Sequence, residues 1–256
     1  MKRILGVAAV LVVLGAVMAG PVAAIALPPC PPLDPCNGTC PILAQFDANC
    51  YAYETMYTPA TFMSTAGSQM TIVGLITQFG GPLSFLNAND PTKEYTFILS
   101  ALVSAGTVVG ANGPTQLFDT DYNQGNATFA IYEGSPRNAP STPAAWAANP
   151  FGGVVVTANF TDGTLILSGM ICGFHTSIAK TGTIVSGSFR ANYQASGGTL
   201  LGTVGTGVGL LGGNWCATSG CQPANYTAQP NGKFDASGGV TAVPRTTWGR
   251  VKQIYR

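Results

Sequence analysis

The chain has 256 residues, of which 46% are hydrophobic and only 8% are charged, and its formal net charge is +1. So many apolar residues exclude a disordered chain, and so few charges exclude the usual helical cytosolic protein, whose exposed helix faces carry many Lys and Glu. The 33 glycines and frequent hydroxyl residues instead indicate a β protein with a polar but weakly charged surface, and no nucleic-acid partner is expected.

Residues 1–24 have the form of a secretory signal peptide. Lys2 and Arg3 precede an apolar run, and Val22-Ala23-Ala24 has the small-x-small form that signal peptidase cleaves. The apolar run is about 16 residues long, whereas a membrane-spanning helix needs about 20. We therefore expect a secreted or cell-surface protein without a transmembrane anchor in the mature chain.

Residues 25–50 are rich in proline and contain four cysteines: Cys30, Cys36, Cys40 and Cys50. Proline disfavours both helices and central strands, so this segment is predicted to be an irregular lead-in. Outside the cell its cysteines are expected to form disulfides, and three pairings remain open. Their spacing fits no usual C-x-x-C zinc motif.

Three further cysteines follow in the body of the chain. Cys216 and Cys221 lie close together in the sequence and are predicted to form a disulfide. Cys172 stands alone within an apolar run and is predicted to be a buried thiol that packs as a small hydrophobe.

Residues 51–230 contain the predicted strands, which are rich in β-branched and aromatic residues and end at Gly, Asn, Asp or Pro. The clearest alternation places Phe189, Ala191 and Tyr193 on one face of a strand. Short turns between these segments favour an antiparallel β-sandwich or jelly roll over an outer-membrane barrel. The predicted strands span residues 51–58, 70–79, 94–109, 127–134, 152–160, 164–178, 182–195 and 199–211.

The stretch FDTDYNQGN places Asp119, Asp121 and Asn123 at alternate positions. Oxygen ligands at such spacing suit Ca²⁺, although Gln124 and Ala130 occupy the positions where an EF-hand needs Gly and an acid. The stretch therefore predicts a polar turn, with calcium binding as the alternative and no other cofactor expected.

Motifs for catalysis are scarce, so no catalytic residue is assigned. The only histidine, His175, is not part of a recognised metal or nucleophile motif. Glutamates such as Glu54, Glu94 and Glu133 could form a glycosidase-like pair, but spacing in the sequence does not establish the required separation. A secreted hydrolase is thus the least favoured function.

Trp215 and Tyr226 flank the second cysteine pair. Trp215 is expected to pack over the disulfide, because large aromatic side chains are usually buried; the alternative is a ligand-binding site in which a rigid loop presents Trp215 and Tyr226 as flat rings to sugars. Residues 231–256 form a predicted linker and basic aromatic tail, with five Lys or Arg against one acidic residue, whereas residues 25–230 have four against nine. Such a tail suits an anionic surface polymer or glycan.

Taken with the signal peptide, these features predict a secreted, non-enzymatic surface or extracellular-matrix protein with a structural or adhesive role. A carbohydrate-binding module that uses exposed aromatic rings is the alternative.

Overall fold

The computed structural model describes residues 41–122, 126–140, 158–218, 220–221 and 226–236. Eight antiparallel strands in this part of the chain pair side by side in a closed ring, because β10 is hydrogen-bonded to both β9 and β11. The barrel strands, in chain order, are β1 (Ile42–Glu54), β4 (Gln69–Phe79), β5 (Glu94–Val103), β8 (Thr128–Gly134), β9 (Thr164–Thr181), β10 (Ile184–Gly197), β11 (Val208–Cys216) and β12 (Gln229–Asp235).

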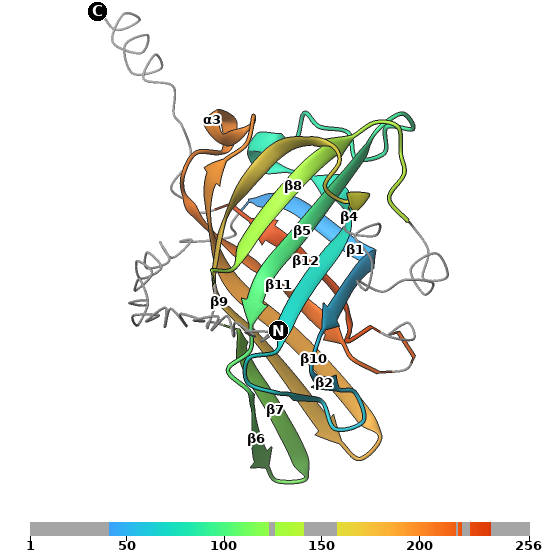
Figure 1. Ribbon diagram of the computed structural model, residues 1–256, viewed down its shortest axis with the longest axis vertical. Coiled ribbons are helices and arrows are strands. Elements are labelled where there is room, and N and C mark those ends of the chain that lie inside the picture. The colour runs from blue at the N-terminus through green and yellow to red at the C-terminus, as the bar shows by residue number, and fades with distance from the viewer. Residues whose placement is uncertain (1–40, 123–125, 141–157, 219, 222–225, 237–256) are drawn as a thin grey trace, which may run out of the picture.

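Two of these strands are long enough to leave the barrel. The first part of β9 pairs with β8, whereas its last part, from Phe174 to Thr181, pairs with β7 (Thr115–Tyr122), which in turn pairs with β6 (Thr107–Asn112). The four strands β6-β7-β9-β10 therefore continue past the barrel as a projecting sheet (Figure 1). We call residues 107–122 and 174–187 the arm.

A bulge marks the point where β9 passes from the barrel into the arm. The register between β9 and β10 shifts between the pairs Cys172–Asn192 and His175–Arg190, and Gly173 has a left-handed φ of +59°. A glycine at positive φ is typical of a β-bulge, which bends the strand and increases its twist.

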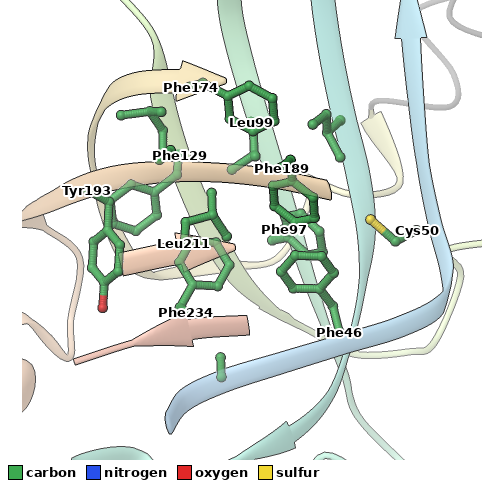
Figure 2. Packing of buried hydrophobic residues seen from close by; sticks show 14 of the residues in the cluster. Phe46, Cys50, Phe97, Leu99, Phe129, Phe174, Phe189, Tyr193, Leu211 and Phe234 are labelled. Atoms are coloured by element: carbon green, nitrogen blue, oxygen red, sulfur yellow. The ribbon is translucent and has the colours of Figure 1, made fainter. Parts of the chain in front are cut away.

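Aromatic side chains fill the inside of the barrel (Figure 2). The rings of Phe46 and Phe97 lie 4.6 Å apart between centroids, and those of Phe129 and Phe234 lie 5.7 Å apart. An eight-stranded barrel is just wide enough for side chains to fill. The interior is consequently a packed core.

The prediction of an all-β antiparallel fold is confirmed, but the two-sheet sandwich or jelly roll is wrong. A sandwich keeps two separate sheets, whereas here the sheet closes on itself through the β9–β10 and β10–β11 ladders. The predicted inward face of β10 is confirmed, since Phe189, Ala191 and Tyr193 are all buried.

The barrel extends beyond the predicted domain boundaries at both ends. β1 begins at Ile42, so the second part of the predicted lead-in is a barrel strand, because no proline follows Pro41 in it. β12 continues to Asp235 and crosses the predicted boundary after residue 230. The predicted signal peptide, residues 25–40 and the tail from residue 237 lie outside the described residues.

Most of the predicted strands are present, with differences where glycine or aspartate is frequent. The predicted strand 94–109 is divided at Gly106 into β5 and β6, and β7 was predicted as a polar turn. The predicted strand 199–211 begins with a short helix, α3 (Leu201–Val204), and residues 152–157 lie outside the described part. Two short strands, β2 (Tyr57–Thr58) and β3 (Met63–Ser64), and a 3-10 turn, η1 (Gly81–Leu83), complete the described elements.

Candidate functional site

The two predicted sugar-stacking residues are buried. Trp215 is 3% exposed and packs against Phe174 and Phe189, with ring centroids 6.3 and 6.0 Å away. Tyr226 is 2% exposed, and its ring lies 5.2 Å from that of Tyr51. The expected burial of Trp215 is confirmed, and the alternative of two exposed stacking rings is wrong. Each side chain lies in a cluster of buried hydrophobic residues, as is usual for large aromatic residues.

The cysteines follow the predicted pattern only in part. Cys216 and Cys221 form the predicted disulfide. Cys172 is disulfide-bonded, so its prediction as a thiol is wrong. Cys50 is a free, buried thiol, and burial raises its pKa well above the ordinary value. It therefore does not belong to the predicted lead-in disulfides; Cys30, Cys36 and Cys40 lie outside the described residues.

The predicted calcium ligands Asp119 and Asp121 lie on strand β7 and not in a turn. Residues two apart on a strand share one face but lie about 7 Å apart along it, so they do not converge as they would in a tight loop. They instead flank a histidine: His175 Nδ1 lies 2.8 Å from Asp121 Oδ1, and His175 Nε2 lies 3.6 Å from Asp119 Oδ1. Asn123 lies outside the described residues.

Among the described residues, no group of three or more His, Cys, Asp and Glu side chains is placed to hold a metal ion. Calcium binding stays a prediction. The contacts that the structure provides for Asp119 and Asp121 are cross-strand polar contacts with His175 in the arm.

A buried carboxylate lies where the arm joins the barrel. Glu54, at the end of β1, is 4% exposed and is hydrogen-bonded to Ser64 of β3 and, at 2.9 Å, to the Tyr122 hydroxyl of β7. Ser64 Oγ also lies 2.6 Å from Ser104 Oγ. Burial raises the pKa of Glu54, and the hydrogen bonds from Ser64 and Tyr122 oppose that effect. This network ties the β2–β3 segment and the arm to the barrel.

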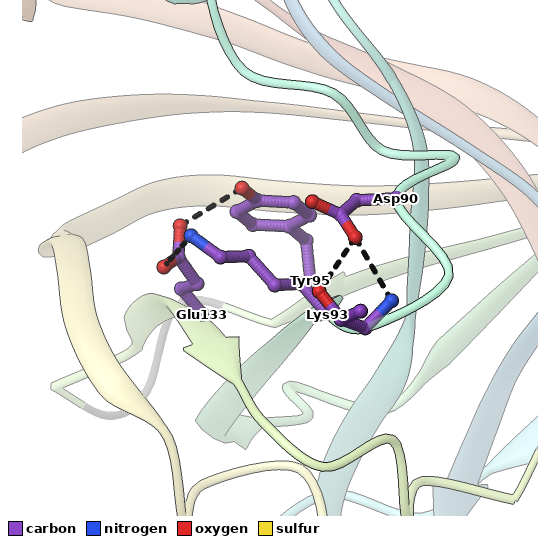
Figure 3. Close-up of polar contacts among 5 residues, drawn as sticks. Asp90, Lys93, Tyr95 and Glu133 are labelled. Carbon is purple, nitrogen blue, oxygen red and sulfur yellow. Dashed lines mark hydrogen bonds and ion pairs between the residues drawn. The ribbon is translucent and has the colours of Figure 1, made fainter.

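A second polar cluster lies at the end of the barrel away from the arm, where Glu133 on β8 pairs with Thr164 at the start of β9. Lys93 Nζ donates to Glu133 Oε1 at 2.7 Å, and the Tyr95 hydroxyl donates to Glu133 Oε2 at 2.8 Å (Figure 3). The bond from Lys93 is the main reason that the pKa of Glu133 is lowered.

A polar cleft of about 370 Å³ opens beside this cluster. The Asn138 side-chain amide donates to Asp162 Oδ2 at 2.6 Å across it. Carboxylates, an amide and hydroxyls are thus gathered at one place, which suits a small polar ligand. The cleft is lined by Glu133, Gly134, Ser135, Pro136, Asn138, Asp162, Gly163 and Thr164.

The most distinctive surface of the protein is the free edge of the arm. β6 is the last strand in the sheet order, and on its far side it pairs with no strand of the described structure. Two of its apolar side chains are exposed, Val108 by 70% and Val109 by 51%. Every second residue of such an edge directs an unpaired N–H and C=O outwards.

This edge was not predicted from the sequence. The segment TVV is typical of a β-strand, but the sequence pattern gives no indication of which strand ends a sheet. The sequence feature that could have indicated the edge is Ala105-Gly106, since glycine often interrupts a strand. In the structure Gly106 has a φ of +95° and separates β6 from the buried strand β5.

No helix in the described part of the chain is long and apolar enough to cross a membrane. The sequence matches no protein-family model, and comparison with curated proteins and with solved structures gives no significant match. The class of the protein is therefore defined by its fold alone: an all-β antiparallel barrel with a projecting arm.

Proposed function

We propose that the protein is a secreted, non-enzymatic structural or adhesive protein that makes contacts through the free edge of its arm. The observation that carries the proposal is the edge strand β6, on which Val108 and Val109 are exposed and whose outward side pairs with no strand of the described residues. Such an edge is a template to which another β-strand adds through main-chain hydrogen bonds.

Because the barrel interior is filled, a function at the outer surface is favoured over ligand binding inside the barrel. Phe46, Phe97, Phe129 and Phe234 occupy the space in which a wider barrel would hold a ligand. The arm, in contrast, projects beyond the barrel (Figure 1). Its edge strand β6 offers outward backbone groups together with the exposed side chains of Val108 and Val109. A low content of charge, 8% of residues, suits a protein that works in close contact with neighbours.

The test is retention at the surface of cells that produce the protein. Wild type is compared with the double variant Val108→Lys, Val109→Lys, and the protein in the medium is compared with that on washed cells. We expect wild type to stay mainly on the cells and the double variant to move to the medium. Wild type recovered wholly from the medium would contradict the proposal.

A second candidate function is binding of a carbohydrate in the polar cleft. Asn138, Asp162 and Glu133 supply amide and carboxylate groups that suit sugar hydroxyls. Glycan-array binding that is lost in Asp162→Ala and kept in the arm double variant would favour this function. The predicted basic tail is a further proposed attachment point for an anionic polymer, and it lies outside the described residues.

A further inference from the structure

We infer that the occupant of the free β6 edge is a second copy of this chain, whose own β6 pairs with it antiparallel across a twofold axis. The inference rests on the proposed function, in which the β6 edge is a contact surface, and it names the partner that binds this edge. The joined arms would form one continuous sheet of two four-stranded halves.

The amino-acid composition of β6 favours pairing with the β6 strand of a second copy. β6 consists of Thr107, Val108, Val109, Gly110, Ala111 and Asn112. Natural edge strands are usually protected from one another by Lys, Pro, a bulge or an inward-pointing charge, and β6 has no charged residue and no proline. Its ladder to β7 runs from Thr107–Thr120 to Asn112–Thr115 without a register shift. Two copies can thus meet without charge repulsion or a break in either strand.

Symmetry restricts the register. A twofold axis perpendicular to the sheet keeps each face of one copy on the same face of the joined sheet, so a residue must pair with one from its own face. Since faces alternate along a strand, the axis lies at one residue position, where that residue faces its own copy. It does not lie between two successive residue positions. An axis through Val109 pairs Val109 with its own copy, Val108 with Gly110, and Thr107 with Ala111. This register brings the half-exposed valines together, and cross-strand β-branched pairs stabilise sheets.

The shape of the protein permits this pairing. β6 runs from the barrel towards the tip of the arm (Figure 1), so an antiparallel partner places its barrel at the other end of the joined sheet. The charges nearest the seam are Asp119 and Asp121 on β7. In the dimer the two β7 strands are three strand spacings apart, about 14 Å, which exceeds the Debye length of about 8 Å at physiological ionic strength. Their repulsion across the seam is therefore weak.

Sedimentation velocity of the purified, secreted full chain over a wide range of protein concentration tests the inference. We expect a reversible monomer–dimer equilibrium for wild type. Val109→Lys places two like charges opposite each other at the axis, and we expect it to weaken dimerisation by at least about tenfold. The matched control is Ile184→Lys, at an apolar residue that is 73% exposed on the other hairpin tip of the arm; it removes similar apolar surface and should dimerise as wild type does.

The register has its own test. Val109→Cys should give a covalent dimer on mild oxidation, because the two thiols lie opposite each other, whereas Ala111→Cys, which faces Thr107 of the other copy, should give little. A wild type that is monomeric at every concentration, or a dimer that Val109→Lys leaves intact, would overturn the inference. A monomer that is still retained on cells refutes only self-pairing, while a dimer found only in the medium refutes only the adhesive function.

Discussion

Two glutamates at the two ends of the barrel illustrate how position determines the behaviour of one residue type. Glu54 is enclosed by the β2–β3 segment and accepts bonds from hydroxyl groups, so burial dominates and raises its pKa. Glu133 remains partly exposed and accepts a bond from the Lys93 ammonium group, which lowers its pKa. The two carboxylates therefore contribute to stability in opposite ranges of pH.

We predict that Glu54→Gln becomes more stable relative to wild type as pH rises. Because the folded pKa of Glu54 is raised, its stabilising contribution is complete below the unfolded value, about 4.3, and is lost as pH rises through the folded value. The free energy of urea unfolding of the variant minus that of wild type should therefore increase from about pH 4 to pH 7. A difference that decreases with rising pH would contradict the raised pKa of Glu54.

The opposite dependence is predicted for Glu133→Gln. The folded pKa of Glu133 is lowered, so its contribution is present above the unfolded value and is lost as pH falls through the folded value. The variant should be less stable than wild type at neutral pH, and the difference should shrink in acid. Lys93→Met, which removes the same ion pair, is the matched variant; equal stability of both variants and wild type at neutral pH would show that the pair contributes nothing.

For single residues, the sequence predicted the chemistry of side chains better than their partners in the folded chain. The Cys216–Cys221 disulfide was predictable because the two residues lie only five positions apart. The exchange of roles between Cys50 and Cys172 was not, since Cys50 belongs to the predicted cysteine cluster and Cys172 to an apolar run. Both are buried, and only the folded chain decides which of them is bonded to another cysteine. The pairing of His175 with Asp119 and Asp121 likewise arises from a ladder between strands about 55 residues apart in sequence.

Among the elements, β9 and β10 determine the shape of the protein, because each runs from the barrel into the arm. Their close approach depends on Gly169: a Cβ there would overlap the Gln194 carbonyl oxygen and lie 2.7 Å from Phe129 Cε1. Both neighbours are fixed, one as backbone of β10 and the other as a buried ring of the core.

We predict that Gly169→Ala lowers the free energy of unfolding by about 1–3 kcal/mol, the usual cost of forcing extra volume into a packed core. The control is Gly202→Ala in α3, where a new Cβ meets nothing within 4 Å and where alanine should stabilise by about 0.5–1 kcal/mol. Chemical denaturation of both variants provides the measurement. A neutral Gly169→Ala would mean that the strands can separate without loss.

Strand positions were predictable wherever alternation was accompanied by β-branched residues, as in β4, β8 and β10. Strands β7 and β12 were missed because their compositions resemble loops. In β7 the pattern of Phe118, Thr120 and Tyr122 inwards and Asp119 and Asp121 outwards has the period of a strand, but its aspartates suggested a turn. In β12, Pro230 and Gly232 gave the appearance of a linker.

For the whole molecule, closure of the barrel was beyond prediction from the sequence. A sandwich and a barrel have the same antiparallel strands and short turns, and they differ only in which distant strands pair. Here the distinction depends on β9 pairing with β8, β7 and β10, and on β10 also pairing with β11. The same long strands produce the arm, and hence the free edge of β6.

Backbone amide exchange of residues 107–112, measured at low and at high protein concentration, tests most directly whether the edge of the arm pairs with a second copy. Amides of β6 that bond to β7 are paired in either state and should exchange at the same rate. The alternate amides, which point outwards, should exchange rapidly in dilute protein and several-fold more slowly in concentrated protein, where a second β6 pairs with them. Outward amides that exchange equally fast at both concentrations would contradict the pairing of β6 with a second copy.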